Sequence, residues 1–216
     1  MTRIAILRAA SCGANIVIYG AVPLLLGLAW PWAPATAAVC SVLSYLACGL
    51  RPRCEPAPPE VWSAAQRVAQ ALGAAPPRAV HTVAGWTAAA LRVRGGYDLL
   101  VGEEVGARHL SAVLAHEVVH SLERDLFWEP FTDGPARLVL HLSRPLPPLA
   151  LLALPFLPFA VPLARATELR ADRLAAGAIE GYAEVLRELS SKLGPPATLL
   201  YPSLSTRIRY AENGAT

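Results

Sequence analysis

Two histidines and a glutamate stand at a spacing that suits metal-assisted hydrolysis. The segment Leu114–His120 reads LAHEVVH and so contains the pattern HExxH. On a helix, His116 and His120 lie one turn apart and project from one face, where both imidazoles could bind a single Zn²⁺ at about 2.0–2.1 Å. Glu117 leans toward the same face and could take a proton from a water molecule as general base. These residues predict one zinc ion per chain and hydrolytic chemistry.

A third protein ligand is needed if the fourth position on zinc is to stay open. Metzincins place a histidine six residues after the second one, but this chain has Leu126 there and Glu123 in place of the preceding glycine, so that class is excluded. Glu168 and Asp172 lie four residues apart and share one face of a helix. Glu168 could ligate zinc, while Asp172 could hydrogen-bond a ligand histidine and fix its tautomer. The alternative is a solvated face of alternating charges, which HExxH makes less favourable.

Two helices must carry these side chains. Apolar residues at helical spacing predict a helix from about Ala107 to Asp125, which bears the HExxH pattern. A second helix is expected from about Arg165 to Lys192, because Gly194 and two prolines follow it. Small residues on this second helix would let it approach the first closely; they are Ala171, Ala175 and Ala176.

The rest of the region after residue 54 predicts an α+β fold that is mainly helical. An amphipathic helix is expected from about Val61 to Leu72, and a short helix over Ser205–Glu212. Strands are expected at residues 78–83 and 89–101, the second folded into a hairpin at its Gly-Gly pair. The resulting small sheet would accompany the two ligand helices.

The N-terminal region is strongly apolar. The chain of 216 residues is 54% hydrophobic, and its mean hydropathy is positive. Residues 14–30 and 34–50 carry no charge, and each is near the lower length limit for crossing a bilayer as a helix. Trp30 and Trp32 at the turn between them suit the headgroup interface. We therefore expect a transmembrane helical hairpin over residues 1–53, followed by a metallopeptidase domain over residues 54–216.

Arginines set the expected orientation of this hairpin. They flank its two open ends, and none lies at its tip. The positive-inside rule then places the N-terminus and everything after Arg51 in the cytoplasm, in a multi-pass protein of the cell (inner, cytoplasmic) membrane. The alternative is a cleaved signal peptide, because Arg3 and Arg8 precede an apolar core with small residues after it. The second apolar stretch would then act as an anchor.

A Pro-rich hydrophobic insertion is expected at about residues 137–164. Six prolines between residues 145 and 164 prevent a regular helix throughout this run. His120 and Glu168 must meet on one side of the membrane, so the segment between them must cross the membrane an even number of times or not at all. A re-entrant or interfacial flap, with Leu142 and Leu163 on the same side, fits better than a span.

Charge and cysteine usage exclude other classes. A net charge of +3 without a recognisable motif gives no reason to expect nucleic acid. The four cysteines, at positions 12, 40, 48 and 54, form no CxxC pair and are expected to be free thiols. The expected partners are a protein or peptide substrate and the lipid bilayer, and no oligomeric state is indicated.

Three segments together resemble a known family. They are AVLAHEVVHSLERD, TELRADRLA and YPSLSTRIRY, which are similar to the HtpX-like and CAAX prenyl protease type-1-like integral-membrane gluzincins over about residues 60–212. The resemblance implies zinc bound by His116, His120 and Glu168. It also implies Glu117 as the general base, with Asp172 supporting the ligands.

The chain departs from that family at two places. Tyr201-Pro202 stands where the family often has His-Pro, and the segment between the ligand helices is shorter than usual. We expect the Tyr201 hydroxyl to donate a hydrogen bond to a tetrahedral oxyanion, although it could simply be packed beside a turn. Arg207 is expected to pair with an acid near the site or with the substrate.

The sequence thus predicts a zinc-dependent membrane endopeptidase acting on membrane-associated or unfolded protein or peptide substrates. Substrate could add as an extended strand beside Leu99–Gly102, expected at the sheet edge. The alternative is a membrane-bound sensor or scaffold with little proteolysis, against which Glu117 argues. A buried intramembrane protease is disfavoured by the charges that flank HExxH. His81 and His109 have no ligand-like spacing and are expected to be ordinary polar residues.

Overall fold

The structure, a computed structural model, describes residues 3–25, 54–122, 126, 132, 157–193 and 201–214. The chain divides into two compact units. One comprises Met1–Leu50 and Phe127–Ala166, and the other comprises Arg51–Leu126 and Thr167–Thr216. The second unit contains every residue expected at the zinc centre.

In the first unit, helix α1 (Arg3–Leu25) starts well before the apolar stretch that predicted it. Ser11 and Asn15, one helical turn apart, are both buried, and both donate hydrogen bonds to the carbonyl oxygen of Thr132, at 3.1 and 2.8 Å. Two donors on one carbonyl satisfy polar groups that would otherwise be costly to bury. They link α1 to a residue more than 100 positions away in the same unit.

The predicted membrane hairpin falls only partly on described residues, because residues 26–53 lie outside them. Within the part of the chain that the structure describes, no helix combines the length and apolarity needed to span a membrane. Of the cysteines, Cys12 and Cys54 are free, as expected, and the other two lie outside the described residues.

The second unit is built on a four-stranded sheet with the order β1-β2-β4-β3. Its strands are β1 (Glu55–Pro56), β2 (Ala79–Val83), β3 (Ala88–Val93) and β4 (Gly96–Gly102). The predicted hairpin is confirmed as β3 and β4, which pair antiparallel around a two-residue turn where Gly95 has φ +81°. A positive φ favours glycine, which has no Cβ to clash. The two-residue strand β1 pairs antiparallel with β2.

The expectation that Leu99–Gly102 forms a sheet edge is wrong. Strand β4 pairs with β2 on one side, in parallel, and with β3 on the other. After β2 the chain passes to the outer position as β3 and turns back to place β4 between them. Apolar Leu99 and Val101 are almost completely buried, as suits an interior strand. The edge next to β4 is therefore β3.

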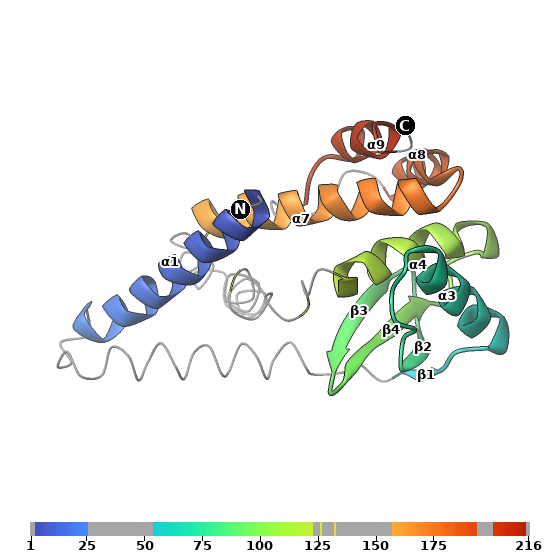
Figure 1. The fold of residues 1–216 in the computed structure, drawn as a ribbon, viewed down its shortest axis with the longest axis horizontal. Coiled ribbons are helices and arrows are strands. Elements are labelled where there is room, and N and C mark those ends of the chain that lie inside the picture. Colours follow the sequence, from blue (N-terminus) through green and yellow to red (C-terminus); the bar gives the residue numbers. More distant parts are fainter. Residues whose placement is uncertain are drawn as a thin grey trace. The chain divides into compact units, whose positions relative to one another are not determined.

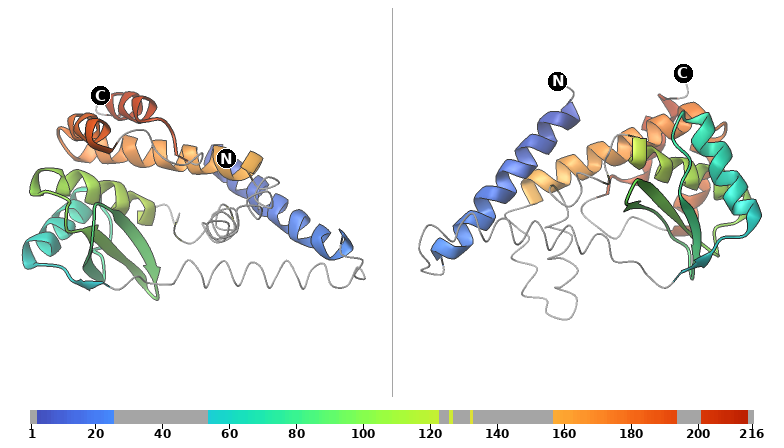
Figure 2. Two further views of the ribbon diagram at one scale, coloured as in Figure 1. Left: turned by 180° about the vertical axis from the view of Figure 1, so that it is seen from behind. Right: turned by 60° about the horizontal axis from the view of Figure 1, so that its bottom comes forward.

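Helices α3 (Pro59–Ala71) and α4 (Ala107–Leu122) pack against this sheet. Both were expected from apolar periodicity. Their buried residues join those of β4 in one hydrophobic core, which includes Ala65, Leu114 and Val118. In the second unit, α4 lies between the sheet and the C-terminal helices, so one of its faces is directed away from the sheet (Figures 1 and 2).

The C-terminal region contains α7 (Leu157–Ala178), α8 (Tyr182–Leu193) and α9 (Leu204–Glu212). The single long helix expected from Arg165 to Lys192 is wrong: it is interrupted before α8, where Gly181 has φ +74°. Helix α7 begins inside the Pro-rich run and contains Pro162. The remainder of that run up to residue 156, including Leu142 of the expected flap, lies outside the described residues. Helix α9 confirms the predicted short helix.

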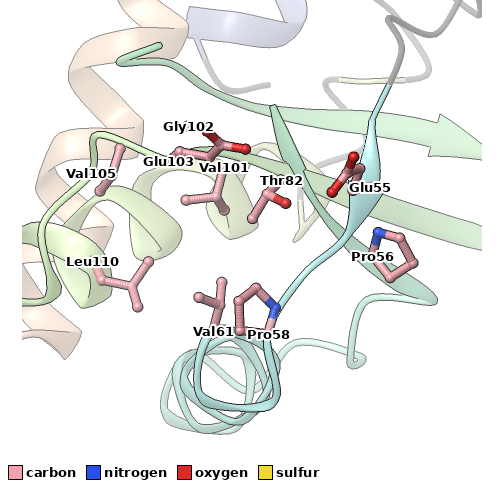
Figure 3. A pocket seen from close by; sticks show the side chains of 10 residues that line it. All are labelled: Glu55, Pro56, Pro58, Val61, Thr82, Val101, Gly102, Glu103, Val105 and Leu110. Carbon is pink, nitrogen blue, oxygen red and sulfur yellow. The ribbon is translucent and has the colours of Figure 1, made fainter. Parts of the chain in front are cut away.

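A cavity of about 380 Å³ lies beside β1, the first turn of α3 and the start of α4 (Figure 3). Apolar side chains such as Val61 and Leu110 line it together with Glu55 and Glu103. None of the histidines or acids expected to bind metal is among its lining residues. The chemistry expected from the sequence is therefore placed elsewhere in this unit.

Candidate metal centre

Helices α4 and α7 bring together three side chains that could hold a metal ion: His116, His120 and Glu168. His116 Nε2 lies 3.1 Å from Glu168 Oε2 and 3.3 Å from His120 Nε2, and His120 Nε2 lies 3.8 Å from Glu168 Oε1. Ligands about 2.0–2.1 Å from a tetrahedral ion would be about 3.3 Å apart. The donor atoms therefore fit the size of a zinc site, as the sequence led us to expect.

Packing fixes the two ligand helices in this relation. On α4, Leu114, Ala115 and Val118 are fully buried, which leaves the histidines on the face directed away from the sheet. On α7, Ala171 and Ala175 are also fully buried. Residues four apart on a helix share a face, so Glu168 and Asp172 project together. Of the small residues on α7, Ala175 belongs to the same buried cluster as Ala115 of α4.

Behind the ligands, a hydrogen-bond network surrounds the second nitrogen of His116. Its Nδ1 lies 3.1 Å from Asp172 Oδ1 and 3.2 Å from the hydroxyl of Tyr182. Tyr182 donates to Asp172 Oδ1 at 2.7 Å. Arg207 donates from Nε to Asp172 Oδ2 at 2.7 Å and from Nη2 to Asp172 Oδ1 at 2.8 Å. Asp172, whose exposed fraction is 0%, is thus paired on both oxygens.

The charges of this cluster shift one another's pKa values. Burial alone would lower the pKa of His116, but hydrogen bonds to Asp172 and Glu168 outweigh it and raise the pKa to about 10. Burial alone would raise the pKa of Glu168, but the hydrogen bond to His116 and the nearby cations lower it to about 2. The pKa of Asp172 is held far below its usual range, against the effect of burial, mainly by Arg207. Burial and the Asp172 carboxylate raise the pKa of Tyr182 well above its usual value.

The expected base is held at the edge of the sheet. Glu117 follows His116 on α4, and its Oε2 accepts a hydrogen bond of 3.0 Å from the backbone N–H of Ala90. Ala90 belongs to the edge strand β3. The carboxylate of Glu117 is therefore held between the ligand helix and the edge strand through Oε2. Its Oε1 takes no part in this hydrogen bond.

The structure resolves one of the two alternatives for Arg207, which pairs with an acid at the site, namely Asp172. His109 is a polar residue paired with Glu188 at 2.9 Å, and His81 lies 3.8 Å from Asp98. Tyr201 is partly buried in the bend before α9, and its role at an oxyanion stays a prediction.

Two partners of the site had not been identified from the sequence. Tyr182 lies ten positions after Asp172, beyond the break between α7 and α8, so no helical spacing connects them. The N–H of Ala90 is a backbone group and has no signature of its own. A buried aromatic residue with a hydroxyl group was the available signal for Tyr182, because such hydroxyls usually find a partner.

Comparisons with known proteins add no assignment. No protein-family model, no curated protein and no solved structure matches this chain. The description of the site therefore rests on its own geometry: a largely buried His-His-Glu group that could hold a metal ion. Glu117 follows one of these ligands on α4.

Zinc binding is expected to strengthen as pH rises. Without metal, the raised pKa of His116 means that its contribution to stability is fully present below pH 6.5 and is lost as pH approaches about 10. Zinc must displace that proton, so its apparent affinity should rise about tenfold per pH unit within this interval.

Thermal unfolding measured from pH 6.5 to 9 tests this linkage. The Tm of the metal-free protein should fall, and the increase in Tm produced by zinc should grow. The variant His116→Asn, which lacks this ligand, serves as the control, and zinc should no longer raise its Tm at any pH in this range. A zinc-induced increase that stayed constant over this range would contradict the protonation state assigned to His116.

Proposed function

We propose that this chain is a zinc-dependent endopeptidase of the HtpX-like and CAAX prenyl protease type-1-like kind. One observation carries the proposal: three ligand atoms lie at zinc-site separations, and a glutamate directly follows one of the ligands in the chain. Two imidazole nitrogens and a carboxylate oxygen form a donor set typical of catalytic zinc sites. His116, His120 and Glu168 would hold the ion.

A bound zinc ion would supply Lewis acidity, which activates water and polarises a carbonyl group. Glu117 acts as the general base: it accepts a proton from water and returns it to the leaving amine. The hydrogen bond from Ala90 keeps one oxygen of this carboxylate fixed, so the other is available for proton transfer. Asp172 and Arg207 act through His116 rather than on the substrate, because their charged groups already pair with each other.

The edge strand β3 is the site proposed for substrate binding. An extended peptide added to β3 would run past the N–H of Ala90 and therefore past Glu117. Backbone pairing of this kind orients a peptide independently of its side chains, which suits unfolded or membrane-associated proteins as substrates.

We also propose that the protein is held in the cell membrane, with the metal centre on the cytoplasmic side. The support comes from sequence: two uncharged stretches at residues 14–30 and 34–50, with arginines outside both open ends. Arg51 and Arg53 stand at the very start of the unit that contains the metal centre.

The decisive experiment compares detergent-purified wild type with Glu117→Gln for zinc content and for cleavage of an unstructured protein such as casein. Zinc content should be equal, because Glu117 is not a ligand. Activity should fall by at least about 100-fold, because the proton acceptor is lost. Glu104→Gln, at an exposed position in the same unit, should keep full activity. Bound zinc without activity in the wild type would favour a sensor, and absent zinc would refute the metal centre.

Peptide substrates with single N-methyl groups test the edge strand. Methylation removes one backbone donor and blocks strand pairing, so kcat/KM should fall about tenfold at positions that pair with β3. At alternate amides, which point away from the strand, the effect should be small. A uniform response along the peptide would argue against strand addition.

Membrane attachment can be tested by alkaline carbonate extraction and cysteine labelling. The protein should stay in the membrane pellet, because an apolar hairpin resists extraction. In a variant that keeps Cys54 as its only cysteine, an impermeant maleimide should label that thiol only after the membrane is permeabilised. Release by carbonate, or labelling of intact cells, would contradict the proposed topology.

A further inference from the structure

Tyr182 is buried against the metal centre. It is the first residue of α8, follows Gly181 directly, and has an exposed fraction of 3%. Its ring belongs to the hydrophobic core of the second unit. A buried hydroxyl group needs a hydrogen-bond partner, and the partners of this one are side chains of the metal centre.

The hydroxyl of Tyr182 has a single hydrogen to donate. Its distance to Asp172 Oδ1 is 2.7 Å and its distance to His116 Nδ1 is 3.2 Å. An ionised carboxylate only accepts, so the hydrogen is directed to Asp172. Toward His116 the phenolic oxygen then presents a lone pair, which matches an N–H at Nδ1 and not a bare nitrogen.

Arg207 is the one neighbour in this network that could support the opposite tautomer. Its Nη2 lies 3.4 Å from His116 Nδ1, and a guanidinium only donates. However, Nη2 makes its shorter bond, 2.8 Å, to Asp172 Oδ1. His116 Nδ1 is therefore faced by two closer acceptors, the oxygens of Asp172 at 3.1 Å and Tyr182 at 3.2 Å.

We infer that Tyr182 is a positioning residue for the proposed metal centre: its hydroxyl helps Asp172 keep the hydrogen of His116 on Nδ1, so that Nε2 presents its lone pair to the ion. The inference rests on the metal site proposed above. Without the hydroxyl, Asp172 loses one donor and the imidazole loses one of the two acceptors that orient it.

Zinc affinity of the full-length protein tests this role without using activity. The Kd for Zn²⁺ is measured by competition with a fluorescent chelator for wild type, Tyr182→Phe and Tyr97→Phe. Tyr182→Phe should bind zinc about 10–100-fold more weakly, the usual cost of losing a group that orients a ligand. Tyr97→Phe is the matched control, because Tyr97 is also buried but donates to the carbonyl oxygen of Ala75, so its affinity should not change.

The outcomes separate this inference from the proposed function. Equal affinity in wild type and Tyr182→Phe would overturn the role of Tyr182 and leave the metal centre intact. Failure of the wild type to bind zinc would overturn both.

A second measurement does not depend on how well the variant folds. In zinc-loaded wild type labelled with ¹⁵N-histidine, nuclear magnetic resonance should show the hydrogen of His116 on Nδ1 and the metal on Nε2. The reverse assignment would overturn the inference. In Tyr182→Phe, the Nδ1–H signal should weaken or become heterogeneous.

Discussion

The second unit depends on one buried charge. Asp172 is shielded completely from solvent, and a buried carboxylate is strongly unfavourable unless it is neutralised and hydrogen-bonded. Arg207 neutralises it with two hydrogen bonds, Tyr182 adds a third, and His116 faces the same oxygen. These partners come from α9, α8 and α4, whereas Asp172 comes from α7. One anion therefore sets the relative positions of four helices, and the ligand His116 is oriented as a result.

The parts of the site that sequence could predict are those governed by a single helix. HExxH and the Glu168–Asp172 pair each follow the helical repeat, so their shared faces could be derived from spacing. The choice of Glu168 as third ligand needed only that two helices meet. For Arg207, the sequence left two partners open, an acid near the site or the substrate, and could not decide between them. Tyr182 could not be predicted, because the helix is interrupted between α7 and α8 and the helical repeat does not continue across that turn.

The sheet shows a similar limit. Alternating residues and the Gly-Gly pair predicted the hairpin of β3 and β4, because both signals are local. They contain no information about which side of the hairpin β2 joins, and that choice depends on burial of Leu99 and Val101 against α3 and α4. The choice matters for chemistry. Since β2 pairs with β4, β3 forms the edge on that side of the described sheet, and the N–H of Ala90 binds Glu117.

The ligands His116 and Glu168 are 52 positions apart in the chain, and the segment between them includes the whole of Phe127–Ala166, which belongs to the other unit. An ion held by both ligands would act as a removable crosslink between the two ends of that segment. The unfolded chain does not hold these ligands together, so the binding free energy of the ion would stabilise the folded second unit. The metal centre would thus join the helix after which the chain leaves the second unit to the helix with which it returns. Metal release and loosening of that unit then become a single cooperative event.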